Sequence, residues 1–341
     1  MKVVTFGEVL LRLAAPGYTK LFQKDSLDAT FCGGEANVAV SLSIFGVDSI
    51  FVTKLPDSDV GYAATHSLDY FKVDTSKIVY GDGRMGLYYL EKGASQRPSR
   101  VIYDRAYSAI ALARREEFDW ASIFDGSDWF HWTGINPALS AELALICEDA
   151  CNVAKEKGLT VSCDLNYRGK LWTPEKAQET IKPLMKYVDV CICNEEDAEK
   201  VLGIRNEMSD VETGELCQAG YVHTAEMIYS NYGCKYIATT LRKSYSASRN
   251  GWSAMLYDAE ALESYFSREY DIQLVDRVGG GDSFGAGLIF ALGTGMSSQD
   301  AIEFATAASC LKQTIEGDFN RTTVKDVETL LKNGGNGRVQ R

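Results

Sequence analysis

The chain has 341 residues, of which 45% are hydrophobic and 24% are charged, and these values fit one large globular domain with a small appendage. Its formal net charge of −12 argues against a nucleic-acid partner, because binding to a phosphate backbone needs a basic face. The nine cysteines show neither metal-ligand nor disulfide spacing, and no apolar run is long enough to cross a bilayer. We therefore expect a cytoplasmic protein with reduced thiols and no contact with membranes.

The N-terminal part predicts alternating strands and helices. Val3–Phe6 is a short apolar run that ends at Gly7, which is typical of a buried parallel strand. The further elements expected here are a helix over Ala36–Phe45 entered through Gly33 and Gly34, a strand over Ile50–Val52 and a helix over Val60–Phe71.

Two segments interrupt this alternation, because they contain strand and turn signals but no helix. The first is 10–32. The second is 85–108, where Gly93 and Pro98 separate the strands Leu87–Leu90 and Arg100–Tyr103. We expect the two segments to form a small antiparallel sheet that projects from the main body as a lid.

Alternation resumes after the second segment and continues to the C-terminal helices. Repeated strand–helix units predict an α/β fold, a three-layer sandwich in which helices cover both faces of a mostly parallel central sheet. The main domain would then comprise residues 1–9, 33–84 and 109–335, with a polar tail at 336–341.

Ligands of such folds bind beyond the carboxyl ends of the strands. Five segments lie just after an expected strand or open a helix, namely Gly33–Gly34, Asp164–Asn166, Asn194–Asp197, Thr240–Arg242 and Gly279–Asp282.

The strongest local signal is the run of three glycines before Asp282. Glycines at a helix start allow backbone N–H groups to approach an anion closely, and the helix adds partial positive charge there. The alternative is a flexible turn with Asp282 as an ordinary N-cap. Gly285 and Gly287 continue inside the helix, where each glycine costs about 1 kcal/mol relative to alanine, so another element or a ligand must pack closely against them.

The chain has no P-loop and no dinucleotide fingerprint after its first strand. Instead, its glycine run resembles the C-terminal signature of the ribokinase-like carbohydrate kinases, the pfkB family, in Asp276-Arg277-Val278-Gly279-Gly280-Gly281-Asp282-Ser283-Phe284-Gly285-Ala286-Gly287. The N-terminal signature of that family is similar to Gly33-Gly34-Glu35-Ala36-Asn37-Val38-Ala39. The two motifs stand in the order of the family, and the resemblance extends over nearly the whole chain.

Three further segments resemble the 2-keto-3-deoxygluconate kinases within this family, namely Tyr103–Ala109, Asp164–Trp172 and Ile315–Asp318. The resemblance implies a ribokinase-like fold and transfer of phosphate from ATP, with Mg²⁺, to the terminal hydroxyl of this sugar acid. It implies Asp282 as the catalytic base and an anion hole built from Gly279, Gly280 and Gly281. An unperturbed Asp has a pKa of about 4, so we expect Asp282 to be ionised at neutral pH.

The resemblance also implies the binding residues. The sugar acid would contact Gly33, Gly34, Asn37, Tyr89, Tyr103, Arg105, Arg168, Asp282 and Asp318. The nucleotide would contact Asn166, Arg168, Asn194, Thr240, Arg242, Gly279 and Gly281. Asp197 would help to hold Mg²⁺ through water, although members of the family often have Glu at this position.

Several alternatives stay open. Arg105 and Arg168 could supply forked donors to a carboxylate, or they could form surface ion pairs. Asp197 could simply be an acidic residue in a first helical turn. The protein could be a fructokinase or another sugar kinase of the family, or a sugar-binding regulator without catalysis, and the sequence does not separate the gluconate substrate from its galactonate epimer. We expect a homodimer or higher homo-oligomer formed through the lid.

Overall fold

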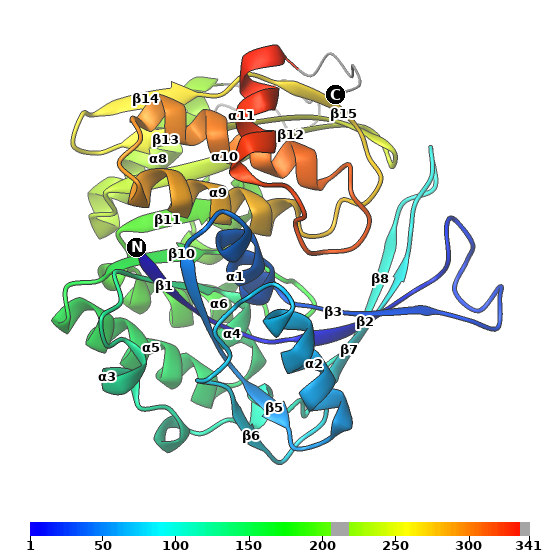
Figure 1. The fold of residues 1–341 in the computed structure, drawn as a ribbon. Coiled ribbons are helices and arrows are strands. Elements are labelled where there is room, and N and C mark those ends of the chain that lie inside the picture. Colours follow the sequence, from blue (N-terminus) through cyan, green and yellow to red (C-terminus); the bar gives the residue numbers. More distant parts are fainter. Residues whose placement is uncertain (206–217, 335–341) are drawn as a thin grey trace.

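The computed structural model describes residues 1–205 and 218–334, and it has the predicted three-layer architecture (Figure 1). The expected tail at 336–341 lies outside the described residues. Within the described ranges, no helix is long and apolar enough to span a membrane. The eight cysteines in these ranges are all buried and free, as their spacing indicated.

The central sheet has nine strands in the order β14-β13-β12-β11-β10-β9-β1-β4, with β15 beside β13. Neighbouring strands from β4 to β12 run parallel, and β13 and the strands after it are antiparallel. The strands are β1 (Lys2–Phe6), β4 (Asp48–Val52), β9 (Trp129–Thr133), β10 (Thr160–Asp164), β11 (Val190–Cys193), β12 (Tyr236–Ser246), β13 (Arg249–Asp258), β14 (Glu263–Phe266) and β15 (Tyr270–Gln273).

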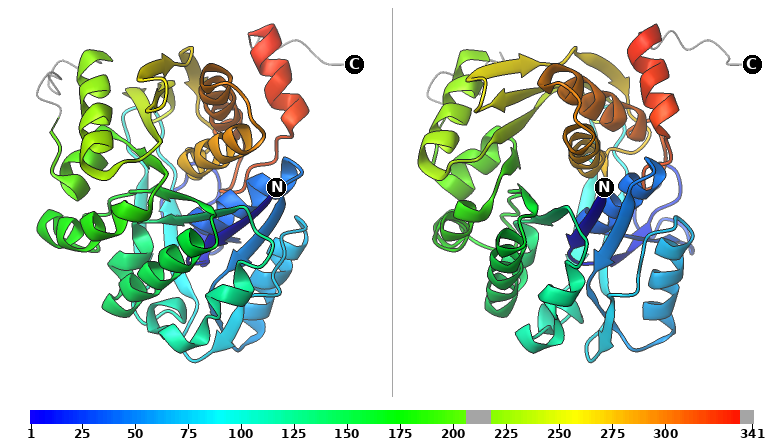
Figure 2. Two further views of the ribbon diagram at one scale, coloured as in Figure 1. Left: turned by 90° about the vertical axis from the view of Figure 1, so that its left-hand side faces the viewer. Right: turned by 60° about the vertical axis from the view of Figure 1, so that its left-hand side comes forward.

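Helices cover both faces of this sheet, which explains why its parallel strands are apolar almost throughout (Figure 2). Successive side chains of β1 point to opposite faces, so Val4 packs in one core cluster and Val3 in the other. The first cluster contains α3 (Trp120–Ile123), α5 (Ala141–Glu156), α6 (Pro174–Ile181) and α8 (Gln218–Tyr232). The second contains α1 (Gly34–Ile44), α9 (Gly280–Gly293), α10 (Ser298–Lys312) and α11 (Val324–Asn333).

Shorter elements connect these layers. α2 (Asp59–Asp69) packs outside α1 through Ala64 and Leu68. The remaining helical turns are α4 (Ile135–Leu139), α7 (Glu195–Asp197), the 3₁₀ turns η1 (Ile110–Leu112), η2 (Arg115–Glu117) and η3 (Lys182–Tyr187), and the π turn η4 (Ala198–Leu202). β5 (Lys54–Pro56) and β6 (Val79–Gly81) form a two-stranded parallel sheet that the sequence did not predict.

The predicted small sheet is present, and it projects from the main body (Figure 1). This lid sheet has the order β3-β2-β7-β8, with β2 (Leu10–Ala14), β3 (Asp28–Cys32), β7 (Gly86–Glu91) and β8 (Arg100–Asp104). The prediction that it is antiparallel is wrong at its centre, because β2 and β7 pair in parallel. Both strands run outward from the main body, while their partners β3 and β8 return. That the segments 10–32 and 85–108 form a separate domain stays a prediction.

The glycines inside α9 have different surroundings. A methyl group at Gly287 would lie 2.9 Å from Cα of Ala305 and 3.3 Å from Cβ of Ala308, so Gly287 lets α9 and α10 approach closely. A methyl group at Gly285 would meet only the side-chain end of Ile192, at 3.5 Å. Packing of helices, and not a ligand, therefore accounts for Gly287.

We predict that Gly287→Ala lowers the free energy of unfolding by about 1–3 kcal/mol, because the added methyl group overpacks the contact between α9 and α10. Gly285→Ala is the matched control in the same helix. It should leave stability unchanged or raise it by up to about 1 kcal/mol, since alanine favours helix. Denaturant titration of both variants measures the difference, and equal stabilities would contradict the packing explanation.

Candidate active site

The two glycine-rich segments of the chain meet at one hydrogen bond. Asn37 of α1 donates from Nδ2 to Oδ2 of Asp282 at 2.6 Å, although 245 positions separate the two residues. A methyl group built at Gly34 would lie 3.7 Å from Oδ1 of Asp282, and one at Gly33 would overlap the backbone carbonyl of Glu8. The structure therefore brings Gly34 and Asn37 next to Asp282, while Gly33 packs against the backbone of Glu8.

The Asp282 carboxyl group is partly buried at the start of α9. Burial raises its pKa to about 6, against the lowering effect of the hydrogen bond from Asn37. The negative charge of Asp318 raises this pKa further, whereas the positive charges of Arg168 and Lys312 lower it. The expectation of an ordinary pKa of about 4 is therefore wrong, but the group is still mostly ionised at neutral pH.

The glycine run forms the first turn of α9. Gly279 is the N-cap, with a left-handed φ of 81°, and a side chain there would also overlap the carbonyl of Asp318. The cap position has no side-chain hydrogen bond, so the alternative of Asp282 as an ordinary N-cap is wrong. The amides of Gly279 and Gly281 have no hydrogen-bond acceptor among the described residues, and the space beside Gly281 is open. These amides can receive an anion.

An acidic cluster faces Asp282 from the carboxyl ends of β10 and β11. Burial raises the pKa of Asp164 well above its usual range, and the carboxylates of Asp197 and Asp282 raise it further. The positive charge of Arg168 lowers the pKa of Asp164, Asp197 and Asp282, so this exposed guanidinium lies within reach of all three. Asn166, buried beside Asp164, has the left-handed φ of 42° that asparagine tolerates.

Asp197 acts as a cap in this structure. Its Oδ1 accepts the amide of Tyr167 at 2.8 Å, and its Oδ2 accepts the amide of Asn194 at 3.0 Å, while Asn194 caps α7 in return. In the described ranges, no three His, Cys, Asp or Glu side chains converge closely enough to hold a metal ion directly. Magnesium ligation by Asp197 stays a prediction, and these residues fit a cation that reaches them through water.

Several arginines near the glycine run have no carboxylate within ion-pair distance in the described part of the chain. They are Arg168, Arg242 and Arg277. Burial lowers the pKa of Arg277, and the nearby charge of Arg242 on β12 lowers it further. Thr240 is half-buried two residues before Arg242. Unpaired cations in a protein of net charge −12 suit anionic ligands.

The lid sheet is tied to the C-terminal signature by a buried polar network. Arg12 of β2 donates from Nη2 to Asp276 Oδ2 at 2.6 Å and from Nη1 to Asp318. Tyr88 of β7 donates its hydroxyl to Oδ2 of Asp318 at 2.7 Å. Both oxygens of Asp318 are thus occupied by the lid, so in this structure Asp318 joins the lid to the main body.

Arg105 also has a protein partner. Its Nε donates to Oε2 of Glu8 at 2.7 Å, its Nη2 donates to the same oxygen, and Ser108 donates to Oε1 of Glu8 at 2.6 Å. The alternative of an ion pair is therefore present for Arg105, although the pair is buried and does not lie at the surface. Its guanidinium stacks over the ring of Tyr103 at 5.2 Å.

The prediction of Tyr89 as a sugar contact needs correction. Alternate residues of a strand point to opposite faces, and in β7 it is Tyr88 that shares a face with Tyr103, with their ring centroids 5.9 Å apart. Tyr89 lies on the other face, where its ring centroid is 6.2 Å from that of Phe22. Tyr88 therefore replaces Tyr89 in the candidate site.

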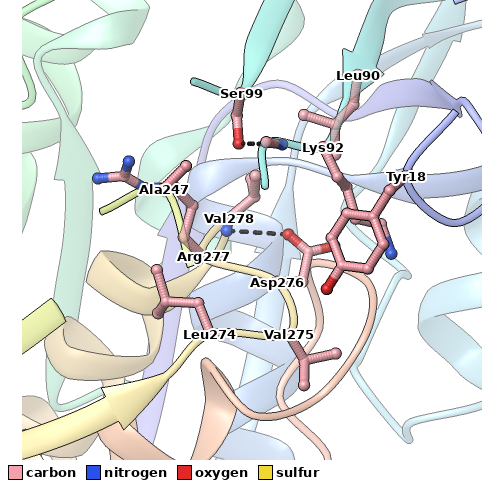
Figure 3. Close-up of a pocket in the computed structure, with 11 residues that line it drawn as sticks. Tyr18, Leu90, Lys92, Ser99, Ala247, Leu274, Val275, Asp276, Arg277 and Val278 are labelled. Atoms are coloured by element: carbon pink, nitrogen blue, oxygen red, sulfur yellow. Dashed lines mark hydrogen bonds between the residues drawn. The ribbon is translucent and has the colours of Figure 1, made fainter. Parts of the chain in front are cut away.

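The lid covers the loop that precedes Gly279. Tyr18, Leu90 and Lys92 of the lid line a small pocket whose opposite wall is Asp276–Val278 (Figure 3). The tip of the lid reaches the turn between β12 and β13, where the Ser95 amide donates to Ser248 Oγ at 2.9 Å. The lid thus closes over the site from one side.

The sequence pattern of the pfkB family carbohydrate kinases matches residues 1–221 and 253–321. The chain belongs to the pfkB family of carbohydrate kinases. As a member of this family, it is a phosphotransferase that acts on a sugar hydroxyl, and kinases of the family use ATP.

Similar members of the pfkB family extend over the whole chain. A crystal structure of 2-dehydro-3-deoxygluconokinase from Thermotoga maritima is 52% identical, with a TM-score of 0.94, and the match covers 98% of this chain and 100% of the other. A pfkB family carbohydrate kinase from Listeria grayi is 32% identical, with a TM-score of 0.90 and the same coverage. The 2-dehydro-3-deoxygalactonokinase of Haloferax volcanii is 31% identical over 336 residues, or 98% of each chain.

Sequence reasoning missed several residues of this pfkB-family site. Asp164 was placed at the ligand edge by the sequence, because it ends an expected strand, but it was given no role there. Arg12 interrupts an otherwise apolar strand, and a charge on the buried face of a strand needs a partner. Arg277 lies inside the C-terminal signature but was given no role, and for Glu8 and Tyr88 the sequence offered no comparable signal.

We predict that kcat/KM for the sugar falls as pH decreases through about 6, because protonated Asp282 cannot accept a proton. The hydrogen bond from Asn37 lowers this pKa, so Asn37→Ala should move the acidic limb to higher pH, by roughly one pH unit. The pH dependence of initial rates measures the acidic limb of wild type and that of Asn37→Ala.

Glu35 is the control for this assignment, because burial raises its pKa to about 7 and its charge interacts with that of Asp282. Glu35→Gln should retain the acidic limb near pH 6. Disappearance of the limb in this variant would show that Glu35, and not Asp282, is the titrating group.

Proposed function

We propose that the protein transfers the γ-phosphoryl group of ATP to the terminal hydroxyl of 2-keto-3-deoxygluconate, also called 2-dehydro-3-deoxygluconate, to give 2-keto-3-deoxy-6-phosphogluconate. The observation that carries the proposal is the hydrogen bond between Asn37 and Asp282 beside the amides of Gly279 and Gly281, which have no acceptor in the described part of the chain. This arrangement would bring a carboxylate base and an anion site together, as phosphoryl transfer to an alcohol requires.

Asp282 is the proposed base. With a pKa of about 6, its carboxylate is ionised at neutral pH and can accept the proton of the attacking hydroxyl. Asn37 holds one carboxylate oxygen at 2.6 Å, which leaves Oδ1 beside the small residue Gly34. The base is therefore oriented before the sugar binds.

The amides of Gly279 and Gly281 would stabilise the negative charge of the transferring phosphoryl group. The unpaired guanidiniums of Arg242 and Arg277 are the candidates for the other phosphates, and Thr240, Asn166 and Asn194 line the same edge of the sheet. Magnesium neutralises phosphate charge when bound, and Asp164 and Asp197 would hold it through water.

The substrate carboxylate needs a cation, and the structure favours Arg168 for this role. Arg168 is exposed and has no carboxylate within ion-pair distance in the described ranges, whereas Arg105 directs two donors to Glu8. Arg105 and Asp318 would then support the site by positioning Tyr103 and Tyr88. The rings of the two tyrosines can pack on the carbon chain of the substrate, and their hydroxyl groups can form hydrogen bonds with the hydroxyl groups of the substrate.

The names of the relatives support a 3-deoxy keto acid but not one epimer. The Thermotoga protein is a 2-dehydro-3-deoxygluconokinase and the Haloferax protein a 2-dehydro-3-deoxygalactonokinase, so the galactonate epimer of the keto acid is the second candidate substrate. A fructokinase is less well supported, because fructose has no carboxylate for Arg168. A regulator without catalysis would need neither a base nor free amides.

Association through the lid sheet and a cytoplasmic location remain part of the proposal. On the face opposite Tyr103, the lid exposes Phe22 and Ile102, and an apolar surface of this kind suits contact with a second copy.

The test is ATP consumption with 2-keto-3-deoxygluconate, its galactonate epimer, fructose and ribose. We predict turnover with the keto acids well above that with the neutral sugars. Arg168→Gln should lower kcat/KM for the keto acid by roughly 10- to 100-fold, because it removes a charge-assisted hydrogen bond to the carboxylate. Preference for a neutral sugar would contradict the proposed substrate.

Arg242→Gln is the matched control, since it removes an exposed arginine assigned to the nucleotide. It should raise KM for ATP and leave KM for the keto acid within about twofold. If both variants changed the keto acid KM equally, carboxylate recognition by Arg168 would be excluded.

A further inference from the structure

Lys312, the last residue of α10, has unusual surroundings for a lysine. Its side chain is completely buried. Nζ donates to the backbone carbonyl of Asp276 at 3.1 Å and to that of Val278, and no carboxylate lies within ion-pair distance of it in the described ranges. Lysine is rarely buried without a paired acid, so this position has a specific requirement for an ammonium group.

A second residue of α10 holds the same loop. Ser309 lies one turn before Lys312 and donates its hydroxyl to the carbonyl of Gly280 at 2.7 Å. Helix α10 therefore binds the carbonyls of Asp276, Val278 and Gly280, which alternate along the loop. The carbonyls of Asp276 and Val278 are held by the positive charge of Lys312, and the carbonyl of Gly280 is held by the neutral hydroxyl of Ser309.

This alternation determines where the intervening amides point. In a planar trans peptide, the carbonyl of one residue and the N–H of the next point in opposite directions. When the carbonyls of Val278 and Gly280 point toward α10, the N–H groups of Gly279 and Gly281 must point away from it. These are the two amides of the run that have no acceptor among the described residues.

Two other amides of the loop are used within it, whereas the amide of Arg277, like those of Gly279 and Gly281, has no acceptor among the described residues. Val278 donates to Oδ1 of Asp276 at 3.2 Å, and Gly280 donates to the carbonyl of Arg277 at 3.3 Å. The loop thus separates into one set of amides that stabilises its own turn and another that remains available to a ligand.

We propose that Lys312 is a positioning residue for phosphoryl transfer, which anchors the carbonyls of Asp276 and Val278 so that the free amides beyond them point at the transferring group. Its ammonium also adds a positive charge behind the anion hole. The inference rests on the proposed kinase function of this site.

Neutralisation of the nearby acids does not explain Lys312. Asp276 and Asp318 are both bonded directly by Arg12, which lies between them. The ammonium of Lys312 donates to carbonyl oxygens of the loop, so its contacts can set the position of the loop.

The test compares Lys312→Met, which keeps the length of the side chain without the charge, with Ser309→Ala, which removes the neutral anchor of the same loop. Steady-state rates with ATP and 2-keto-3-deoxygluconate should show kcat of Lys312→Met reduced roughly 10- to 100-fold, with KM for the sugar changed less than about threefold. The Ser309→Ala loss should be smaller.

Ammonium chloride provides a readout that a merely structural role would not affect. Ammonium can occupy the space left by the lysine head group, so it should restore part of kcat in Lys312→Met and nothing in Ser309→Ala. Tetramethylammonium has the same charge but no N–H donor and should restore nothing.

A binding experiment separates failure of this inference from failure of the proposed function. ADP with aluminium fluoride and Mg²⁺ mimics the transferring group without any sugar. Lys312→Met should bind this mixture at least about tenfold more weakly than wild type and bind ADP alone equally well. If wild type turned over no sugar but this difference held, the proposed substrate would fail and the role of Lys312 would stand.

Folded Lys312→Met with kcat within about twofold of wild type would overturn the inference, as would a loss that ammonium does not relieve. If Lys312→Met does not fold, Lys312→Arg replaces it in the test. Arginine keeps the charge but places its donors differently, so kcat should still fall at unchanged KM for the sugar. Wild-type kcat in this variant would also overturn the inference.

Discussion

The hydrogen bond between Asn37 and Asp282 is the contact on which the rest of the site depends. It can form only if α1 and α9 start at the same edge of the sheet, close enough for a 2.6 Å contact. This condition is met because α1 leads into the parallel strand β4, whereas α9 follows β15, which is antiparallel to β13 and therefore runs in the same direction as β12. The acidic cluster, the free arginines and the lid then surround that contact from neighbouring strands.

A second constraint joins the lid to this centre. Arg12 lies between Asp276 and Asp318, and Tyr88 completes the network from the neighbouring strand. Breaking a buried ion pair by removing one partner costs about 3–5 kcal/mol, so the lid and the loop before the anion hole are held in one arrangement. The same loop is held from the other side by α10. The position of the glycine run is therefore fixed from two directions.

The sequence allowed the local part of this site to be predicted. Glycines before Asp282, and Asn37 after Gly33 and Gly34, mark helix starts with room for a ligand, and alternating apolar strands and helices predicted the layers. Each of these signals is contained in a short segment of the chain, and for that reason it can be read without a structure.

Features that depend on distant partners could not be predicted. Whether Arg105 is free or paired depends on Glu8, 97 residues away, and the choice between Tyr88 and Tyr89 depends on which face of β7 meets the main body. Lys312 is a basic residue in the last turn of a helix, which is an ordinary position for lysine, and only packing shows that its ammonium reaches the carbonyls of the glycine loop. The parallel pairing of β2 with β7 likewise follows from the direction in which each strand leaves the core.

The most direct measurement is turnover by Asp282→Asn with ATP and 2-keto-3-deoxygluconate, beside calorimetric binding of both ligands. Asparagine preserves the shape of the side chain but cannot accept the proton. We predict a folded protein that binds both ligands and has kcat reduced by about 10²–10⁴-fold. A folded variant with kcat near that of wild type would contradict the assignment of Asp282 as the base.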